Sequence, residues 1–215
     1  MLGLPAIRTG DTTNTVNTNA VTSIATEYKS SPEARRIGYG LTGQLALTER
    51  FGLAFGAYLR RVGYTLDTTV TTNVTGFVNG IQGVTSSSTN VHDDTRARVL
   101  NVPFLLRYYS KGRHEPGPRW FAEAGGAFQT LLSPRTTLSS TDAIGNASCC
   151  TVSTSHFAHR SVLGVEGGAG VQLIDPVGIR VVPEVRYTRW MNPLIDDNTA
   201  HNQRNQVEAS LSLSF

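Results

Sequence analysis

Apolar and polar residues alternate with a period of two through most of the chain. In residues 35–48, for example, Ile37, Tyr39 and Leu41 fall on one face and small or polar residues fall on the other. Side chains at positions i and i+2 of a strand share a face, so this alternation predicts strands with one apolar side. Seven segments carry the pattern: residues 35–48, 51–66, 96–109, 119–132, 159–174, 177–190 and 204–215.

The connections between these segments alternate in length. The short ones are residues 48–52, 110–119 and 175–178, and the long polar ones are residues 10–34, 67–95, 133–158 and 191–203. Short turns at one end and long loops at the other are typical of outer-membrane β-barrels. An even number of strands is required when both termini lie at the short-turn end. We therefore expect an eighth strand at residues 2–8, although Pro5 is unfavourable inside a sheet.

Two local signals refine these strands. The alternation shifts near Arg60 and Arg61, which predicts a β-bulge there. Asn79 and Gly80 stand between two β-prone runs, which favours a type I′ hairpin. The third and fourth strands are therefore expected to project well beyond the membrane.

The polar faces carry arginine and glutamate in equal numbers. The eight charged residues are Arg60, Arg107, Glu123, Glu166, Arg180, Glu184, Arg186 and Glu208. A soluble barrel of the lipocalin type would turn this face to water and its apolar face to a ligand cavity. A solvent-facing surface has no reason to be rich in glycine, free of lysine and balanced in charge. We therefore expect these residues inside an eight-stranded barrel, where each desolvated charge needs a counter-charge.

The apolar faces fit contact with lipid. Their central positions carry no arginine, each of which would cost roughly 2–4 kcal/mol at the bilayer midplane. Aromatic residues fall near the strand ends and are predicted to form two interfacial girdles. The girdle at the short-turn end comprises Phe51, Tyr108, Trp120 and Phe215, and the girdle at the long-loop end comprises Tyr64, Phe157, Tyr187 and Trp190.

Composition narrows the class of protein. Of the 19 cationic residues only Lys29 and Lys111 are lysine, and arginine suits paired, partly buried sites better. The net charge of +3 comes without a basic run or aromatic-basic interleaving, so nucleic acid is not an expected partner. No stretch approaches the roughly 18 apolar residues of a membrane helix, so any spanning structure must consist of strands. No signal peptide is evident at the first residue, so the numbering is expected to begin on a processed or recloned chain.

The last segment, NQVEASLSLSF, alternates apolar residues and ends in an aromatic one. With the phrases LRRVGY, FAEAGGAF and PEVRYTRW, the chain resembles the small bacterial outer-membrane β-barrel domain family, akin to the transmembrane domains of OmpA and OmpX. The similarity covers residues 35–215 and implies no activity, because such proteins serve as anchors or adhesins. It implies that the barrel assembly machinery recognises the last strand, a role carried onto Val207, Leu211, Leu213 and Phe215.

Candidate catalytic residues are few. His159 and Ser161 are spaced to share a strand face, as in barrel enzymes that deacylate lipid A. No acidic residue that would orient the histidine is evident beside them, so no catalytic residue is predicted.

Cys149 and Cys150 are adjacent. Outside the cell they are expected to form a disulfide, with each other or between two molecules. A soft-metal site with His156 and His159 is an alternative, but adjacent cysteines rarely ligate one ion, so no metal site is predicted. The acidic residues at 92–94 and 196–197 are expected to be solvated rather than to bind a divalent cation.

The sequence thus predicts one domain over residues 1–215. Its expected fold is an all-β, eight-stranded antiparallel up-and-down transmembrane barrel of the bacterial outer membrane, with short periplasmic turns and long extracellular loops. We expect an anchor or adhesion protein without enzymatic activity or cofactor. Expected partners are outer-membrane lipid and lipopolysaccharide, the barrel assembly machinery, and an extracellular protein, a polysaccharide or a second copy. The alternatives are a lipid-modifying barrel enzyme and a narrow channel, although long side chains should block so small a barrel.

Overall fold

Every regular element of the described chain is a β-strand. The structure, a computed structural model, describes residues 2–3, 7–9, 11–17, 22–32, 37–78, 81–115, 117–153, 159–175, 178–194 and 200–214. Its strands are β1 (Leu2–Gly3), β2 (Ile7–Thr9), β3 (Thr12–Asn17), β4 (Thr22–Pro32), β5 (Gly38–Ala46), β6 (Phe51–Val78), β7 (Ile81–Tyr109), β8 (Arg119–Thr141), β9 (Ala147–Ser153), β10 (Ser161–Ile174), β11 (Arg180–Trp190), β12 (Ala200–Asn202) and β13 (Asn205–Ser214). None of the described residues forms a helix of the length and hydrophobicity that would span a membrane.

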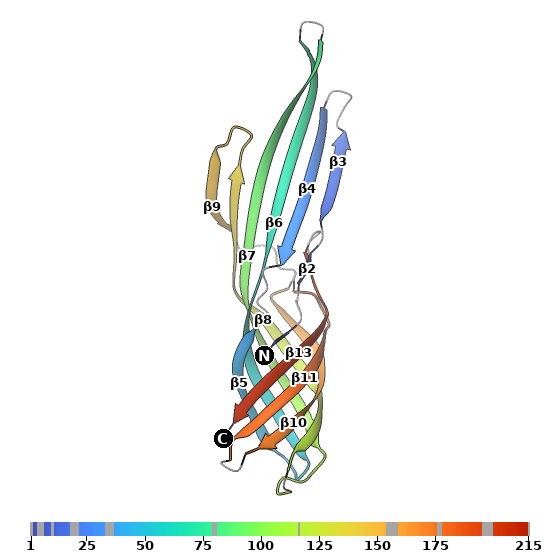
Figure 1. The fold of residues 1–215 in the computed structure, drawn as a ribbon, viewed down its shortest axis with the longest axis vertical. Coiled ribbons are helices and arrows are strands. Elements are labelled where there is room, and N and C mark those ends of the chain that lie inside the picture. The colour runs from blue at the N-terminus through green and yellow to red at the C-terminus, as the bar shows by residue number, and fades with distance from the viewer. Residues whose placement is uncertain are drawn as a thin grey trace.

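One curled antiparallel sheet holds 11 of these strands, and β2 pairs separately with β12 (Figure 1). Its main path is β1-β13-β11-β10-β8-β7-β6-β4-β3, with β5 also paired to β6 and β9 to β8. Eight of the described strands are the main ones: β4, β5, β6, β7, β8, β10, β11 and β13. Strands that follow one another along the chain are mostly neighbours in space, which is the order of an up-and-down barrel.

The lower part of the sheet is the barrel wall, formed by β5, β10, β11, β13 and the lower parts of β6, β7 and β8 (Figure 1). These are the seven strands that the alternation predicted. Two of the short connections are tight turns, in which the Phe51 N–H donates to Thr48 Oγ1 at 3.0 Å and the Gly178 N–H donates to the Asp175 carbonyl at 2.8 Å. Gly178 has a φ of +91°, a left-handed conformation that glycine adopts without a steric cost.

The eighth main strand differs from the prediction. Of residues 2–8, only β1 joins the wall, opposite Ala209 and Glu208 of β13, while β2 pairs with β12. The eighth long strand is instead β4, which lies inside the segment predicted as the loop at 10–34. Residues 4–6, Pro5 included, lie outside the described part of the chain. Within the described residues β5 pairs only with β6, so the seam of the wall lies between β5 and β1.

Above the wall the sheet continues as an open, six-stranded extension (Figure 1). It consists of β3, β4, β9 and the upper parts of β6, β7 and β8. β4 replaces β5 as the neighbour of β6, since β5 pairs with residues 52–60 and β4 with residues 64–74. β6 and β7 stay paired as far as Val78 and Ile81, which confirms that these two strands project far beyond the barrel. The predicted turn at Asn79 and Gly80 lies outside the described residues.

The loops predicted at 10–34 and 133–158 were therefore wrong, because much of each is strand, whereas the connection at 67–95 forms the paired ends of β6 and β7 that its hairpin signal predicted. The loop predicted at 191–203 is described only in part and contains β12. The prediction relied on one apolar face per strand. No residue from 65 to 94 is buried where the structure describes its exposure, so both faces of the paired β6 and β7 meet water there. Such strands depend on threonine and other residues of high β-propensity and on cross-strand pairs, and alternation of hydrophobicity does not reveal them.

The predicted bulge at Arg60 and Arg61 was also wrong. The β6–β7 ladder keeps one register from Phe51 to Val78. The register shift lies instead between β7 and β8, at Arg96 and Arg98. Arg61 simply continues the outward face of β6, so an outward charge, and not an inserted residue, interrupts the hydrophobic pattern.

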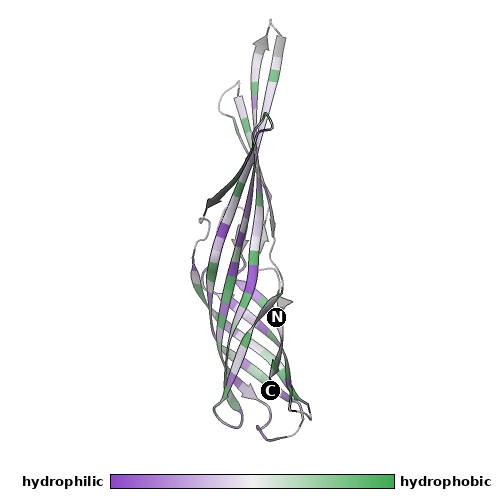
Figure 2. Ribbon diagram, turned by 90° about the vertical axis from the view of Figure 1, so that its left-hand side faces the viewer, coloured by the Kyte–Doolittle hydropathy of each residue, from purple (hydrophilic) through white to green (hydrophobic). Residues whose placement is uncertain are grey.

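Side chains of the wall alternate between the lipid side and the interior. On β8, Phe121 and Glu123 are buried whereas Trp120 and Ala122 are exposed. Exposed apolar side chains on neighbouring strands include Phe104, Leu106, Leu163, Val165, Val185, Leu211 and Leu213. Figure 2 shows this hydrophobic colouring on the barrel strands. Apolar residues outside and charges inside are the reverse of a soluble lipocalin-type barrel, so the prediction of a membrane barrel is confirmed.

Apolar clusters lie at both ends of the barrel interior. The upper apolar cluster consists of Val62, Tyr64, Ala97, Val99, Ala127, Leu131, Val162, Trp190 and Leu194. The lower apolar cluster consists of Tyr109, Phe121 and Val182. The prediction of a mainly polar interior missed both clusters, which close the interior above and below its charged layer.

The upper cluster corrects the predicted girdle at the long-loop end. Tyr64 and Trp190 are 2% and 1% exposed and point inward, whereas Tyr187 is exposed. Trp190 lies four residues after the inward-facing Arg186 on β11, so a strict period of two would have predicted an inward side chain. At the other end Phe51, Tyr108 and Trp120 face outward as predicted, while Phe157 and Phe215 lie outside the described residues.

We expect Leu131→Ala to lower the free energy of unfolding by about 2–5 kcal/mol, because it leaves a cavity in the upper apolar cluster. Leu163→Ala is the matched control, because Leu163 is 57% exposed on the outer wall. Denaturant titration in detergent micelles, read by the heat-modifiable gel shift of the folded barrel, measures both. Equal losses in the two variants would contradict the inward packing of Leu131.

Candidate functional site

The middle of the barrel interior holds a charge network of Arg107, Glu123, Glu166, Glu184 and Arg186. Arg107 Nε lies 2.6 Å from Glu123 Oε2, and its Nη2 lies 2.5 Å from Glu184 Oε2. Arg186 reaches Glu123 Oε1 at 3.0 Å, Glu184 Oε1 at 2.5 Å and Glu166 Oε1 at 3.5 Å. All five residues are buried. Each arginine therefore bridges carboxylates from different strands, as the sequence predicted for a desolvated interior.

A glycine on β10 makes this bridging possible. Gly168 lies opposite Glu123 on β8 and opposite Arg186 on β11. A Cβ atom at Gly168 would lie 2.7 Å from the Val185 carbonyl oxygen, 3.0 Å from Glu123 Oε1 and 3.1 Å from Arg186 Cγ. Glu123 and Arg186 meet across an intervening strand because that strand has no side chain at this position.

Hydroxyl groups and aromatic rings complete the network. Ser210 Oγ donates to Glu184 at 2.7 Å, and Thr188 Oγ1 donates to Glu166 at 3.1 Å. The Arg107 guanidinium carbon lies 4.3 Å from the centre of the Phe121 ring. Buried charges need such additional partners, because one counter-charge does not replace the lost hydration. The sequence had not assigned Ser210, Thr188 and Phe121 as partners, although all three share the inward face of their strands.

A second ion pair links the charge network to the upper apolar cluster. Arg60 Nη1 lies 3.2 Å from Glu208 Oε1, which joins β6 to β13 across the interior. Gln206 Nε2 also donates to Glu208, and its Oε1 accepts a hydrogen bond from Trp190 Nε1 at 3.0 Å. Two buried residues of β13 thus have different partners: Glu208 binds the Arg60 guanidinium, and Gln206 binds the Trp190 indole.

Arg180 differs from the other seven predicted interior charges. It is half-buried, and in the described part of the chain it forms none of the ion pairs of the network. It lies at the short-turn end, where strand ends are reached by water. Arg119 occupies the lower interior instead, with its guanidinium carbon 4.2 Å from the centre of the Tyr109 ring. Arg119 shares the face of Glu123, so its position was predictable from the period of two.

The predicted His159 and Ser161 pair does not form a catalytic arrangement. Ser161 Oγ lies 2.9 Å from Thr130 Oγ1, and the His159 N–H donates to the Leu194 carbonyl. Within the described residues neither side chain contacts a carboxylate. A histidine base needs an orienting acid in reach, and the described residues place none beside His159.

Cys149 and Cys150 are joined to each other by a disulfide on β9. Of the two outcomes expected, the structure shows the intramolecular one. The β8–β9 register shifts at this point, where Ser139 lies opposite Cys149 and Leu138 opposite Thr151. Cys150 is the extra residue of this irregularity and has a φ of +81°. The disulfide therefore sits at a bulge in the extension.

The acidic residues around His92 form an ion pair in the extension. His92 Nδ1 lies 2.5 Å from Asp67 Oδ1 across the β6–β7 ladder. The hydrogen bond that the charged His92 ring donates to the Asp67 carboxylate raises the pKa of His92 above its ordinary value of 6.5. Within the described residues no group of three or more histidine, cysteine or acidic side chains is arranged to hold a metal ion. Residues 196–197, the other acidic candidate, lie outside the described part.

The β8–β9 turn is held by Asp142. Its carboxylate accepts hydrogen bonds from the Asn146 side-chain amide at 3.0 Å, from the Asn146 backbone N–H at 2.7 Å and from the Ile144 N–H at 3.0 Å. These donors stabilise the charged form and lower the pKa of Asp142.

The residues assigned to assembly lie on the outer wall. Val207, Leu211 and Leu213 are exposed on β13, and Phe215 lies outside the described residues. Their recognition by the assembly machinery stays a prediction.

We expect Gly168→Ala to destabilise the barrel by about 1–3 kcal/mol, since the added methyl group would press against the Val185 carbonyl oxygen and overpack the space between Glu123 and Arg186. Gly167→Ala is the control, because a Cβ atom there would meet nothing closer than 3.7 Å. Urea unfolding of both variants in lipid vesicles provides the comparison. A Gly168→Ala barrel as stable as the Gly167→Ala barrel would show that the glycine does not govern this contact.

We expect the NMR titration midpoint of His92 to lie above 6.5 and to fall in Asp67→Asn, because the variant removes the carboxylate that favours the charged imidazole. Since the folded pKa is raised, the pairing stabilises the extension below pH 6.5 and this stabilisation is lost as the pH rises through the folded pKa. Asp142→Asn, in the β8–β9 turn, is the control. An unchanged midpoint in Asp67→Asn would rule out this pairing in solution.

The comparisons with known proteins agree with this architecture. The sequence matches the model of the outer membrane protein beta-barrel domain family over residues 7–196. No curated protein and no solved structure matches the chain. Because the family match covers most of the sequence and the wall has lipid-facing apolar and inward-facing charged residues, the chain belongs to the outer membrane protein beta-barrel domain family and resides in the bacterial outer membrane.

Proposed function

We propose that the protein is a non-catalytic anchor that holds the extension outside the outer membrane, where its edges bind an extended protein segment. The observation that carries the proposal is the continuity of β6, β7 and β8 from the wall into the extension (Figure 1). A force or contact at the outer end is passed to the barrel through backbone hydrogen bonds. A flexible loop would not provide such a rigid link.

The extension offers free strand edges. In the described residues β3 pairs only with β4, and β9 pairs only with β8. The described side chains of β3 are exposed. Unpaired N–H and C=O groups along an edge accept another strand, and the main-chain hydrogen bonds then provide affinity. The partner is therefore a protein with an extended segment or a second copy of this chain; a surface polysaccharide is the alternative that the test distinguishes.

The outer surface of the barrel wall indicates further partners. We expect its apolar outer surface to contact outer-membrane lipid and lipopolysaccharide, and β13 to be recognised by the barrel assembly machinery. An enzyme or channel has less support, since His159 and Ser161 lack an acid partner and the interior is filled by the charge network between two apolar clusters. Two cavities at the short-turn end measure only about 80 Å³ and 60 Å³.

We expect cells that display the protein to clump, or to adhere to a protein-coated surface, more than cells without it. Thr13→Lys with Thr15→Lys on β3 should abolish the gain, because charges on an edge strand oppose strand addition. The control is Thr71→Lys with Asn73→Lys on β6, which adds the same charge to a strand flanked by β4 and β7.

Three results would count against the proposal. They are no gain in adhesion over cells lacking the protein, equal losses in the edge and inner-strand variants, and adhesion that persists on a purified polysaccharide but not on protein. Surface proteolysis and the heat-modifiable gel shift confirm that each variant is displayed and folded.

A further inference from the structure

Four arginines gather on the outer wall where the barrel passes into the extension. This arginine cluster consists of Arg61 on β6, Arg96 and Arg98 on β7, and Arg135 on β8, all exposed. Arg61 lies opposite Arg98, and Arg96 lies opposite Arg135. Like charges opposite each other on neighbouring strands destabilise a sheet. A negative charge placed between these facing arginines would therefore stabilise the sheet.

One of the four arginines has an acidic partner on its own strand. Arg96 Nη2 lies 2.7 Å from Asp94 Oδ2. Among the described residues no ion pair to an acidic side chain is formed by Arg61, Arg98 or Arg135. In the charge network, by contrast, each arginine contacts at least two carboxylates.

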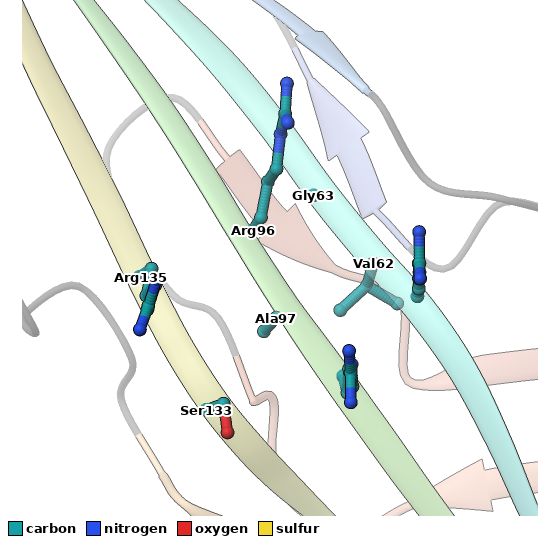
Figure 3. A pocket seen from close by; sticks show the side chains of 8 residues that line it. Val62, Gly63, Arg96, Ala97, Ser133 and Arg135 are labelled. Atoms are coloured by element: carbon teal, nitrogen blue, oxygen red, sulfur yellow. The ribbon is translucent and has the colours of Figure 1, made fainter.

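The arginine cluster surrounds a hollow that is large enough for a ligand. The hollow measures about 730 Å³ and is lined by the four arginines together with Val62, Gly63, Ala97 and Ser133. Figure 3 shows Arg96 and Arg135 on adjacent strands, with Ser133 beside Arg135. The register shift between β7 and β8 falls here, and Ser133 has a φ of +49°. A bulge redirects side chains, so Ser133 and Arg135 open onto the same hollow as the arginines of β7.

The position of the arginine cluster relative to the membrane indicates which partner it meets. Arg61 and Arg98 lie two residues beyond the paired Leu59 and Leu100 of the lipid-facing wall, a step of about 7 Å along the strands. β10 begins at Ser161, opposite Thr130, so the wall ends at this level too. Figure 2 shows hydrophilic colouring where the long strands leave the barrel. Polar headgroups lie directly outside the hydrocarbon layer of a membrane.

We propose that the arginine cluster binds the phosphate groups of a phosphorylated glycolipid in the outer leaflet, the lipid A type of molecule, with its acyl chains along the apolar wall below. The planar guanidinium matches two phosphate oxygens at once, and several arginines together suit a headgroup that carries more than one phosphate. Ser133 adds a hydroxyl donor. Gly63 allows β6 to approach β7 closely beneath the hollow, since a Cβ atom there would lie 2.8 Å from the Thr95 carbonyl oxygen. This inference does not depend on the proposed adhesive function.

The test is equilibrium binding in mixed detergent micelles with three probes: bisphosphorylated lipid A, the same glycolipid with both phosphates removed, and inorganic phosphate. The intact protein is expected to bind the bisphosphorylated form and not the dephosphorylated form. Arg61→Gln with Arg98→Gln should weaken binding by about ten-fold per arginine. Arg50→Gln with Arg113→Gln is the matched control, because these two exposed arginines lie at the short-turn end and should leave the affinity unchanged.

Equal affinity for the phosphorylated and dephosphorylated glycolipids would overturn the proposal, as would an unchanged affinity in the Arg61 and Arg98 variant. Displacement of the glycolipid by an equal concentration of inorganic phosphate would overturn it as well, since the site would then serve free phosphate. The gel shift shows that each variant is folded. If the double variant does not fold, Arg135→Gln alone replaces it, with the same expected direction and the same contradicting result.

Discussion

The fold depends on the pairing of desolvated charges inside the barrel. A buried guanidinium without a carboxylate is costly, so Arg107 and Arg186 have to find Glu123 and Glu184 wherever those strands pair. These four residues come from β7, β8 and β11, and they meet in only one registration of the strands. A slip by one residue would place every charge in lipid and every apolar side chain in the interior. The charge network is thus weak evidence for high stability and strong evidence for a single register.

The same constraint explains how the extension is supported. It has little apolar surface of its own to bury, and an isolated ribbon of this kind is marginally stable in water. β6, β7 and β8 are already fixed by the charge network and the upper apolar cluster before they leave the membrane. Their upper parts therefore begin from a set register, and β4, β3 and β9 add to an existing sheet edge. The strand register that is set in the wall therefore continues along the backbone into the extension.

Three chemically distinct levels follow one another along these strands. The interior of the wall holds paired charges, the outer rim holds four exposed arginines, and the extension holds threonine and serine on both faces. The first level lies in a dry interior and the last meets water.

The sequence by itself determined which side chains share a face. Alternation is a local property of the pleat, and it therefore located the seven wall strands, the lipid-facing residues and, of the eight charges that it nominated, the seven that form ion pairs inside the barrel. The tertiary structure decided what depends on pairing between distant segments. Only the register shows that Glu123 reaches Arg186 over Gly168, that Arg61 and Arg96 gather with Arg98 and Arg135, and that threonine-rich segments form strands. Those outcomes are set by neighbours far away in the chain and by the position of each level relative to the membrane, and hydrophobic periodicity carries no information about either.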